Sequence, residues 1–158
     1  MKDPLAEPPM IDVALNRIVI REGSEQQYIF LRELAGNRGF PIVIGTSEAC
    51  EIRRVVQGIQ PERPLTHQLA YESIKALGAE LKRVDIVDLR NNTFFAQLVL
   101  QDERGERTAI VDARPSDAVA LALRADCPMR VAESVLEAVR TDTSGPDPDP
   151  GADPAAEE

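Results

Sequence analysis

The feature that most constrains the fold of this chain is residues 110–123, an apolar run with a cluster of polar residues in its middle. A strand that ends at Asp112, a turn at Arg114-Pro115 and a helix capped by Ser116 would explain the cluster. A serine hydroxyl at the N-cap accepts a hydrogen bond from a free amide of the first turn, and the preceding proline blocks an earlier helix start. The sequence therefore predicts a corner between a buried strand and a buried helix.

A second corner of this kind predicts the fold class. Residues 42–49 align without gaps on residues 111–118, and each stretch would start a helix with a small cap and an acidic residue favoured by the helix dipole. Three strand-like segments precede each of these helix starts. We therefore expect an α+β fold, with a mixed or antiparallel sheet and packed helices, built from two related β-β-β-α halves.

The expected strands cover residues 11–20, 28–34, 41–44, 84–90, 93–101, 108–112 and 128–131. The expected helices follow caps at Ser47, Thr66 and Ser116, and a last helix covers residues 132–140. Only the second corner contains Asp112 and Arg114, because Val43 and Gly45 stand at the matching positions of the first. We interpret what the halves share as structural and what only one half has as the better candidate for function.

The segment around Asn91-Asn92 predicts a hairpin and an oligomer. Asparagine tolerates the positive φ of a two-residue turn, and a tight turn here would place Ile86 opposite Gln97. Both faces of that hairpin would be largely apolar. A sheet of this kind is covered on both sides, by helices or by a second subunit, so we expect a homodimer or a larger homo-oligomer.

Length and composition indicate one globular domain between two terminal segments. The chain has 158 residues, 43% of them hydrophobic and 28% charged. We expect a flexible lead-in over residues 1–10, one domain over residues 11–140, and a disordered acidic, Pro-rich tail over residues 141–158. No stretch is apolar enough for a membrane span or a signal peptide, which predicts a cytoplasmic protein. Two distant cysteines, Cys50 and Cys127, are expected to be free thiols.

The net charge argues weakly against a general nucleic-acid partner. The whole chain carries −9, but residues 1–140 hold 18 basic and 21 acidic residues, so the expected domain is only mildly acidic. Neutralising phosphates supplies much of the affinity for nucleic acids, and their binders usually show a basic surplus. A local basic patch nevertheless fits within a nearly neutral total.

Three segments of the chain resemble a known family. They are residues 63–67 (Arg-Pro-Leu-Thr-His), residues 78–80 leading to Asp88-Leu89, and residues 112–118 (Asp-Ala-Arg-Pro-Ser-Asp-Ala). Together they resemble the bifunctional nuclease domain family over roughly residues 11–140, with the last segment as the most distinctive signature. DNase and RNase activities have been attributed to that family. The resemblance implies a nuclease of low sequence specificity whose partner is DNA or RNA.

Residue chemistry on the matching segments gives candidate sites. Phosphodiester hydrolysis commonly uses carboxylates to hold divalent ions such as Mg²⁺ or Mn²⁺, together with a cation for the phosphate and a proton acceptor. The candidate metal ligands are Asp88, Asp112 and Asp117. The candidate catalytic residues are Asp112, Arg114 and His67. Arg114, as a bidentate phosphate clamp, and Ser116 are the candidate substrate-binding residues.

A structural role for these residues stays open as the alternative. Arg114 would then pair with Asp112 or Asp88, while Asp117 would only favour the start of its helix through the dipole. His67 would be exposed in the first turn of its helix. Under this hypothesis the protein is a non-catalytic module that binds a protein or a small ligand. Whether Asp88 reaches Asp112 depends on strand order, which the sequence does not fix.

Overall fold

The computed structural model describes residues 7–142, which form one eight-stranded sheet and four helices. The strands are β1 (Met10–Val19), β2 (Gln26–Glu33), β3 (Arg38–Gly45), β4 (Ala79–Arg90), β5 (Thr93–Asp102), β6 (Thr108–Ala113), β7 (Met129–Ala132) and β8 (Thr141–Asp142). The helices are α1 (Thr46–Gln57), α2 (Thr66–Ala76), α3 (Pro115–Ala125) and α4 (Glu133–Val139).

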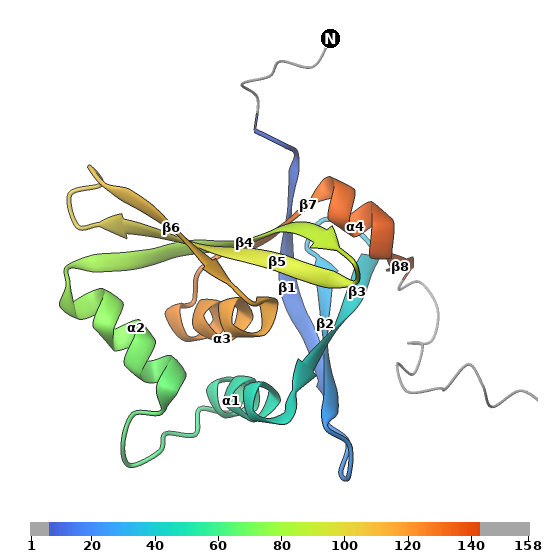
Figure 1. Ribbon diagram of the computed structural model, residues 1–158, viewed down its shortest axis with the longest axis horizontal. Helices are drawn as coiled ribbons and strands as arrows, with labels where there is room; N and C mark the ends of the chain where they lie inside the picture. Colours follow the sequence, from blue (N-terminus) through green and yellow to red (C-terminus); the bar gives the residue numbers. More distant parts are fainter. Residues whose placement is uncertain (1–6, 143–158) are drawn as a thin grey trace, which may run out of the picture.

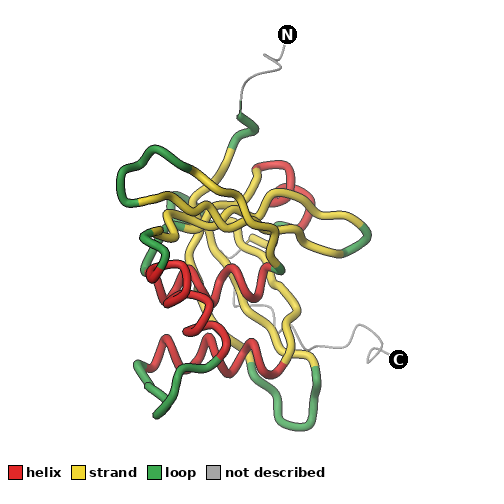
Figure 2. The backbone as a smooth tube through the Cα atoms, turned by 60° about the vertical axis from the view of Figure 1, so that its left-hand side comes forward, coloured by secondary structure: helices red, strands yellow, loops and turns green. Residues whose placement is uncertain are grey.

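The sheet is mixed, as the sequence predicts, and its order is β6-β5-β4-β7-β1-β2-β3-β8. Every neighbouring pair is antiparallel except β4 and β7, which run parallel. Two wings, β4–β6 and β1–β3, meet at β7 with α3 lying between them (Figure 1). Helices α1 and α2 both contact α3, whereas α4 lies apart from them and contacts β3, β4 and β7 (Figure 2). The α+β class is confirmed.

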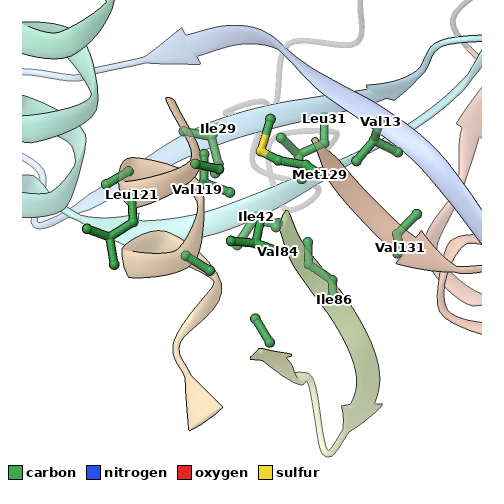
Figure 3. Packing of buried hydrophobic residues seen from close by; sticks show 14 of the residues in the cluster. Val13, Ile29, Leu31, Ile42, Val84, Ile86, Val119, Leu121, Met129 and Val131 are labelled. Carbon is green, nitrogen blue, oxygen red and sulfur yellow. The ribbon is translucent and has the colours of Figure 1, made fainter. Parts of the chain in front are cut away.

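Helix α3 forms the centre of the core because its sequence is apolar on almost every side. Residues 118–122 are all buried, and none of them is more than 5% exposed. A helix that is apolar all round can be stable in water only when other elements cover it. Strands of both wings do so through Ile29, Ile42, Val84 and Ile86, which Figure 3 shows around Val119 and Leu121. The small alanines of α3 let these strands approach closely.

The helices start at other residues than the predicted caps. The N-cap residues of α1, α2 and α3 are Gly45, Leu65 and Arg114, and none of them makes a side-chain capping bond. The prediction that Ser47, Thr66 and Ser116 are caps was therefore wrong. In α3 the reason is Pro115, which fits the first helical position because its fixed φ suits a helix and that position needs no N–H. Ser116 then falls inside the first turn and is buried.

The hairpin between β4 and β5 turns at the predicted residues but has a different register. Asn91 and Asn92 adopt positive φ of 50° and 60°, as expected. A β-bulge between Ile86 and Asp88 inserts one residue, so Ile86 faces Ala96 and not Gln97.

The two faces of this hairpin differ in polarity, contrary to the sequence prediction. Val84, Ile86 and Leu98 are buried in the core on the inner face, the side of α3. The outer face carries Asp85, which Arg130 of β7 binds through two hydrogen bonds of 2.8 and 2.9 Å. The outer face of the hairpin therefore combines a buried ion pair with apolar side chains such as Val99, and the homo-oligomer stays a prediction.

The boundaries of the folded part differ slightly from the expected ones. The order of three strands followed by a helix occurs twice, in β1-β2-β3-α1 and β4-β5-β6-α3, while a duplication as its origin stays a prediction. Strand β8 lies beyond the expected domain end at residue 140 and pairs with β3, and the Thr141 hydroxyl donates to the Gly39 carbonyl at 3.2 Å. The rest of the predicted tail, residues 143–158, lies outside the described residues.

Two smaller expectations concern membrane spans and cysteines. None of the helices in residues 7–142 is long and apolar enough to cross a bilayer. Cys50 and Cys127 are free thiols, as predicted. Burial raises the pKa of the Cys127 thiol to about 11, so this group is protonated and a poor nucleophile at neutral pH.

Candidate functional site

Four polar side chains meet where the first turns of three helices converge; we call Glu48, His67, Arg114 and Asp117 the quartet. Arg114 Nε donates to Asp117 Oδ2 at 2.9 Å, and its Nη2 donates to Glu48 Oε1 at 2.9 Å and to Asp117 Oδ1 at 3.2 Å. His67 Nε2 lies 2.8 Å from Asp117 Oδ1. Three segments far apart in the sequence are thus joined through one arginine and one aspartate.

The position of each member follows from how its helix starts. Glu48 and Asp117 lie in the first turns of α1 and α3, where the helix dipole favours a carboxylate. Both α1 and α2 pack against α3, which brings their N-terminal turns together. Gly45 leaves room for this arrangement, because a Cβ at that position would collide with the Glu48 carboxylate.

The charges of the quartet stabilise one another. Hydrogen bonds to Asp117 and then to Glu48 raise the pKa of the Arg114 guanidinium above its ordinary value. Burial of the Asp117 carboxyl opposes its ionisation, but hydrogen bonds from Arg114 and His67 outweigh burial and lower the pKa of Asp117. The ionised Asp117 can only accept, so His67 Nε2–H is the donor of this bond, and Nδ1 is the ring nitrogen that can accept a proton when it carries none.

A groove lies beside Arg114. Its volume is about 470 Å³, and it runs between β3, the tip of the β4–β5 hairpin and the corner before α3. Pro41, Val43, Phe94 and Pro115 give it apolar walls. Its polar lining residues are Glu25, Gln26, Asn92, Thr93, Arg114 and Ser116. Ser116, predicted to bind substrate, is therefore at the groove, although its residue is only 7% exposed. A groove of this size has room for a nucleotide-sized group.

The structure places Asp112 away from the quartet. Asp112 of β6 pairs with Gln97, and Gln97 pairs with Asp85, so these side chains share the outer face of the sheet. Helix α3 and the quartet belong to the inner side. Within the described part of the chain, Arg114 forms ion pairs with Glu48 and Asp117 and none with Asp112. The alternative in which Arg114 pairs with Asp112 or Asp88 is therefore wrong.

Asp88 is separate from both groups. It lies near the hairpin tip, where its carboxylate pairs with Arg90 Nε at 3.0 Å. The three candidate metal ligands do not come together, and residues 7–142 contain no group of three Asp, Glu, His or Cys side chains arranged to hold a metal ion. In the quartet, Arg114 and His67 already occupy both oxygens of Asp117. The donor set of the quartet, as arranged here, does not fit a divalent ion.

Sequence reasoning missed one member of the quartet. Of the predicted site residues, the structure brings together His67, Arg114 and Asp117, and it adds Glu48. The signal for Glu48 was its alignment with Asp117, which we interpreted as a shared structural role. The two residues share more than the helix start, because both bind the same arginine.

Comparisons with known proteins agree with the resemblance. The model of the "Bifunctional nuclease domain" matches residues 29–144, which include the whole quartet. An uncharacterised protein of Mycobacterium tuberculosis (strain H37Rv) is 46% identical over 127 residues, covering 80% of this chain and 74% of that protein.

Two plant proteins named as nucleases are more distant. "Bifunctional nuclease 2" of Oryza sativa subsp. japonica is 29% identical over 119 residues, covering 73% of this chain and 36% of the rice protein. "Bifunctional nuclease 1" of Arabidopsis thaliana is 27% identical over 92 residues, covering 58% of this chain and 28% of that protein. The likeness to the plant proteins is thus limited to a minor part of their length. On the extent of the domain match, this chain belongs to the bifunctional nuclease domain family.

Proposed function

We propose that this protein is a nuclease of low sequence specificity that hydrolyses phosphodiester bonds in DNA or RNA, and that the quartet is its active site. The observation that carries this proposal is that Arg114 is both held in place and exposed. Its side chain is 65% exposed, yet carboxylates from two helices hold it in place beside the 470 Å³ groove. An arginine that is both fixed and accessible suits the recognition of a phosphate group.

Arg114 has donors to spare for a phosphate. Its Nε and Nη2 bind Asp117 and Glu48, whereas Nη1 has no hydrogen-bond partner among residues 7–142. Two N–H bonds of Nη1 are therefore available to a phosphate oxygen. A nucleotide base or sugar would lie against the apolar walls of the groove, formed by Pro41, Val43 and Phe94. Low sequence specificity is carried over from the family resemblance.

His67 is the proton acceptor in this proposal. With Nε2–H bound to Asp117, Nδ1 accepts a proton from a water molecule as the water oxygen forms its bond to phosphorus. The P–O bond to the departing sugar oxygen then breaks, and that oxygen takes a proton from solvent. Arg114 stabilises the negative charge that grows on the phosphate oxygens during this step.

A divalent ion stays part of the sequence-based hypothesis, but no step is assigned to it. The donors of the quartet are engaged by Arg114 and His67, so a metal would require Asp117 or Glu48 to exchange partners. Activity with Mg²⁺, with Mn²⁺ and with a chelator is the direct measure of metal dependence.

The deciding experiment compares cleavage of plasmid DNA and single-stranded RNA by wild type and variants, with each metal and with chelator. We expect Arg114→Ala and His67→Gln to lose about 100-fold or more in activity. The matched control is Arg104→Ala, an exposed arginine in the turn before β6. Strand β6 separates Arg104 from the quartet by about 20 Å.

The activity of Asp112→Asn shows on which side of the sheet the active site lies. Activity close to that of the wild type would support the quartet, and loss of activity in a folded protein would place the chemistry on the outer face. Equal cleavage by the wild type and Arg114→Ala would refute the proposed site. No cleavage under any condition would refute the nuclease proposal.

A second candidate, the non-catalytic module that binds a small ligand, is favoured by another cavity. A volume of about 730 Å³ lies between β1, α1 and α3, and its lining includes Leu15, Val56, Leu123 and Met129 but no member of the quartet. Saturable binding of an apolar fluorescent dye that Val56→Trp blocks, in a protein without nuclease activity, would favour this candidate. We also propose a cytoplasmic location for this protein, and this proposal rests on the sequence alone.

A further inference from the structure

Strand β6 forms one end of the sheet and has an apolar, accessible edge. It pairs only with β5, and residues 108–112 are all exposed. Ile110 is 54% exposed on the outer face and Val111 is 41% exposed on the inner face. Unpaired edge strands attract other strands, and proteins usually protect them with lysine, proline or a covering segment. Residues 108–113 contain no lysine and no proline.

The other end of the sheet has the protection that β6 lacks. Strand β8 covers the beginning of β3 by pairing with Arg38 and Gly39. Arg38 also binds Glu33 at 2.9 Å and Glu133 at 2.7 Å, and Pro41 has no N–H to offer another strand. The difference between the two ends shows that, among residues 7–142 of the same chain, only β5 pairs with β6.

The backbone of β6 shows which groups are available. The Asp102 amide donates to the Arg107 carbonyl at 3.1 Å, which fixes the alternation of bonds along the β5–β6 pair. Ala109, Val111 and Ala113 therefore direct their backbone groups towards β5. The residues that direct N–H and C=O groups away from the sheet are Thr108, Ile110 and Asp112.

We propose that two copies of this chain pair antiparallel through β6, with Ile110 on the two-fold axis, so that their sheets form one continuous sheet. This register overlaps residues 108–112 of the two strands. It sets Ile110 opposite the partner's Ile110 and forms about six backbone hydrogen bonds from the three outward-facing residues of each copy. The exposed apolar side chains are then paired with each other.

The side chains are self-complementary in this register. Thr108 faces the partner's Asp112 on the outer face, so a hydroxyl donor meets a carboxylate acceptor, and Asp112 does not face another Asp112. Ala109 faces the partner's Val111 on the inner face. Like charges directly opposite one another would destabilise the pair, and this register contains none within the strand. A second copy therefore fits the edge better than an unrelated strand without this match.

Sedimentation of the full chain over a wide concentration range tests the pairing. We expect the wild type to show a monomer–dimer equilibrium, and Ile110→Lys to raise its dissociation constant about tenfold or more, because two lysines would face each other on the axis. The matched control is Ile59→Lys. Ile59 follows α1 and is 53% exposed, so the same substitution at equal exposure should leave the equilibrium unchanged.

Cross-linking tests the register without depending on lysine. Ile110→Cys should form an intermolecular disulfide under mild oxidation, because facing residues of a hydrogen-bonded pair have Cα atoms about 5.5 Å apart. Ile59→Cys should form far less, and it also controls for Cys50 and Cys127. A wild type that stays monomeric, unchanged dimerisation of Ile110→Lys, or equal cross-linking of the two cysteine variants would each overturn the proposal.

Discussion

Arg114 shows how one residue can serve structure and chemistry through different atoms. Two of its nitrogen atoms tie α1 to α3, and the third has no hydrogen-bond partner among residues 7–142. Fixing a long side chain before the substrate arrives reduces the entropy that binding would otherwise cost. The planar fork is needed for this arrangement, since a lysine has a single nitrogen to offer.

Arg114→Lys should therefore fail to rescue activity although it keeps the charge. We expect its kcat/KM on single-stranded RNA to lie near that of Arg114→Ala, because one ammonium group cannot bind Glu48, Asp117 and a phosphate together. The melting temperature should stay within a few degrees of the wild type, since the side chain is largely exposed. Retention of more than half the wild-type kcat/KM would show that charge alone suffices.

Asp117 gives a prediction about pH. Its pKa is lowered in the folded protein, so its interactions stabilise the fold above the ordinary carboxyl range and lose their effect as pH falls through the lowered value. Asp117→Asn should cost about 1 kcal/mol of unfolding free energy at pH 7. The difference from the wild type should shrink at about pH 3 and below. Denaturant unfolding at pH 7 and pH 3 measures the difference in unfolding free energy between the wild type and Asp117→Asn. The same difference at both pH values would contradict this explanation.

The sequence identified most of the individual site residues correctly. The signature around Arg114 identified both that residue and Asp117, and residues 63–67, which lead into α2, identified His67. Asp112 was included because it is close to Arg114 in sequence, but β6 ends between them and each side chain leaves the backbone on a different side of the sheet. Two residues that are close in sequence can therefore lie on opposite faces of the sheet when a strand ends between them.

At the scale of elements, a buried ion pair joins α1 to α3 behind the quartet. Arg124 Nη2 binds Glu51 Oε1 at 2.6 Å, and Arg54 Nη1 binds the other oxygen at 2.9 Å. Burial opposes the charge of Glu51, but the two arginines outweigh burial and lower its pKa. This contact fixes the two helices whose first turns hold Glu48 and Asp117.

Breaking that ion pair on one side should destabilise the fold strongly. Arg124→Met would leave the Glu51 carboxylate buried with Arg54 alone, and we expect a loss of about 3 kcal/mol in unfolding free energy. The double variant Glu51→Met, Arg124→Met should recover most of the loss, because apolar side chains of similar size can replace a buried pair. Urea unfolding of the two single variants and the double variant checks this; a double variant as unstable as Arg124→Met would contradict it.

Elements were predictable where the signal is periodic and less so at their ends. The expected strands and helices all occur, because alternation and helical spacing extend over several residues. The bulge near Val87 was missed, since one inserted residue in a mostly apolar strand leaves no mark in the pattern. The cap of α3 was misplaced because Pro115 occupies the first helical position and moves the start of the helix before Ser116.

For the whole molecule, the end of the folded part leads to a test with two truncations. Ending the chain at Asp142 should leave the melting temperature within about 2 °C of the wild type, because residues 143–158 contain no core-forming side chains. Ending it at Arg140 removes β8 and the hydroxyl bond of Thr141, and should lower the melting temperature by several degrees. Thermal unfolding followed by circular dichroism distinguishes them, and equal values would show that β8 adds no stability.

The site as a whole could not be derived from the sequence because it depends on the order of the strands. The connection from β6 through α3 to β7 places α3 between the two wings, and only then do α1 and α2 meet its first turn. Strand order is decided by which long-range pairing buries the most apolar surface, and local patterns do not record it. This is why Glu48, 66 residues from Arg114, was not expected beside it.

The parallel strand β7 has a consequence for how the chain folds. Strands β1–β3 and β4–β6 each form from neighbours along the sequence, whereas β7 joins them by pairing with β1 and β4 at once. Until residues 129–132 have left the ribosome, the inner edges of both wings remain open to pairing with other chains. We therefore expect the slowest folding step near the end of synthesis, when the four residues of β7 close the sheet. Before that step the open strand edges can aggregate with other chains.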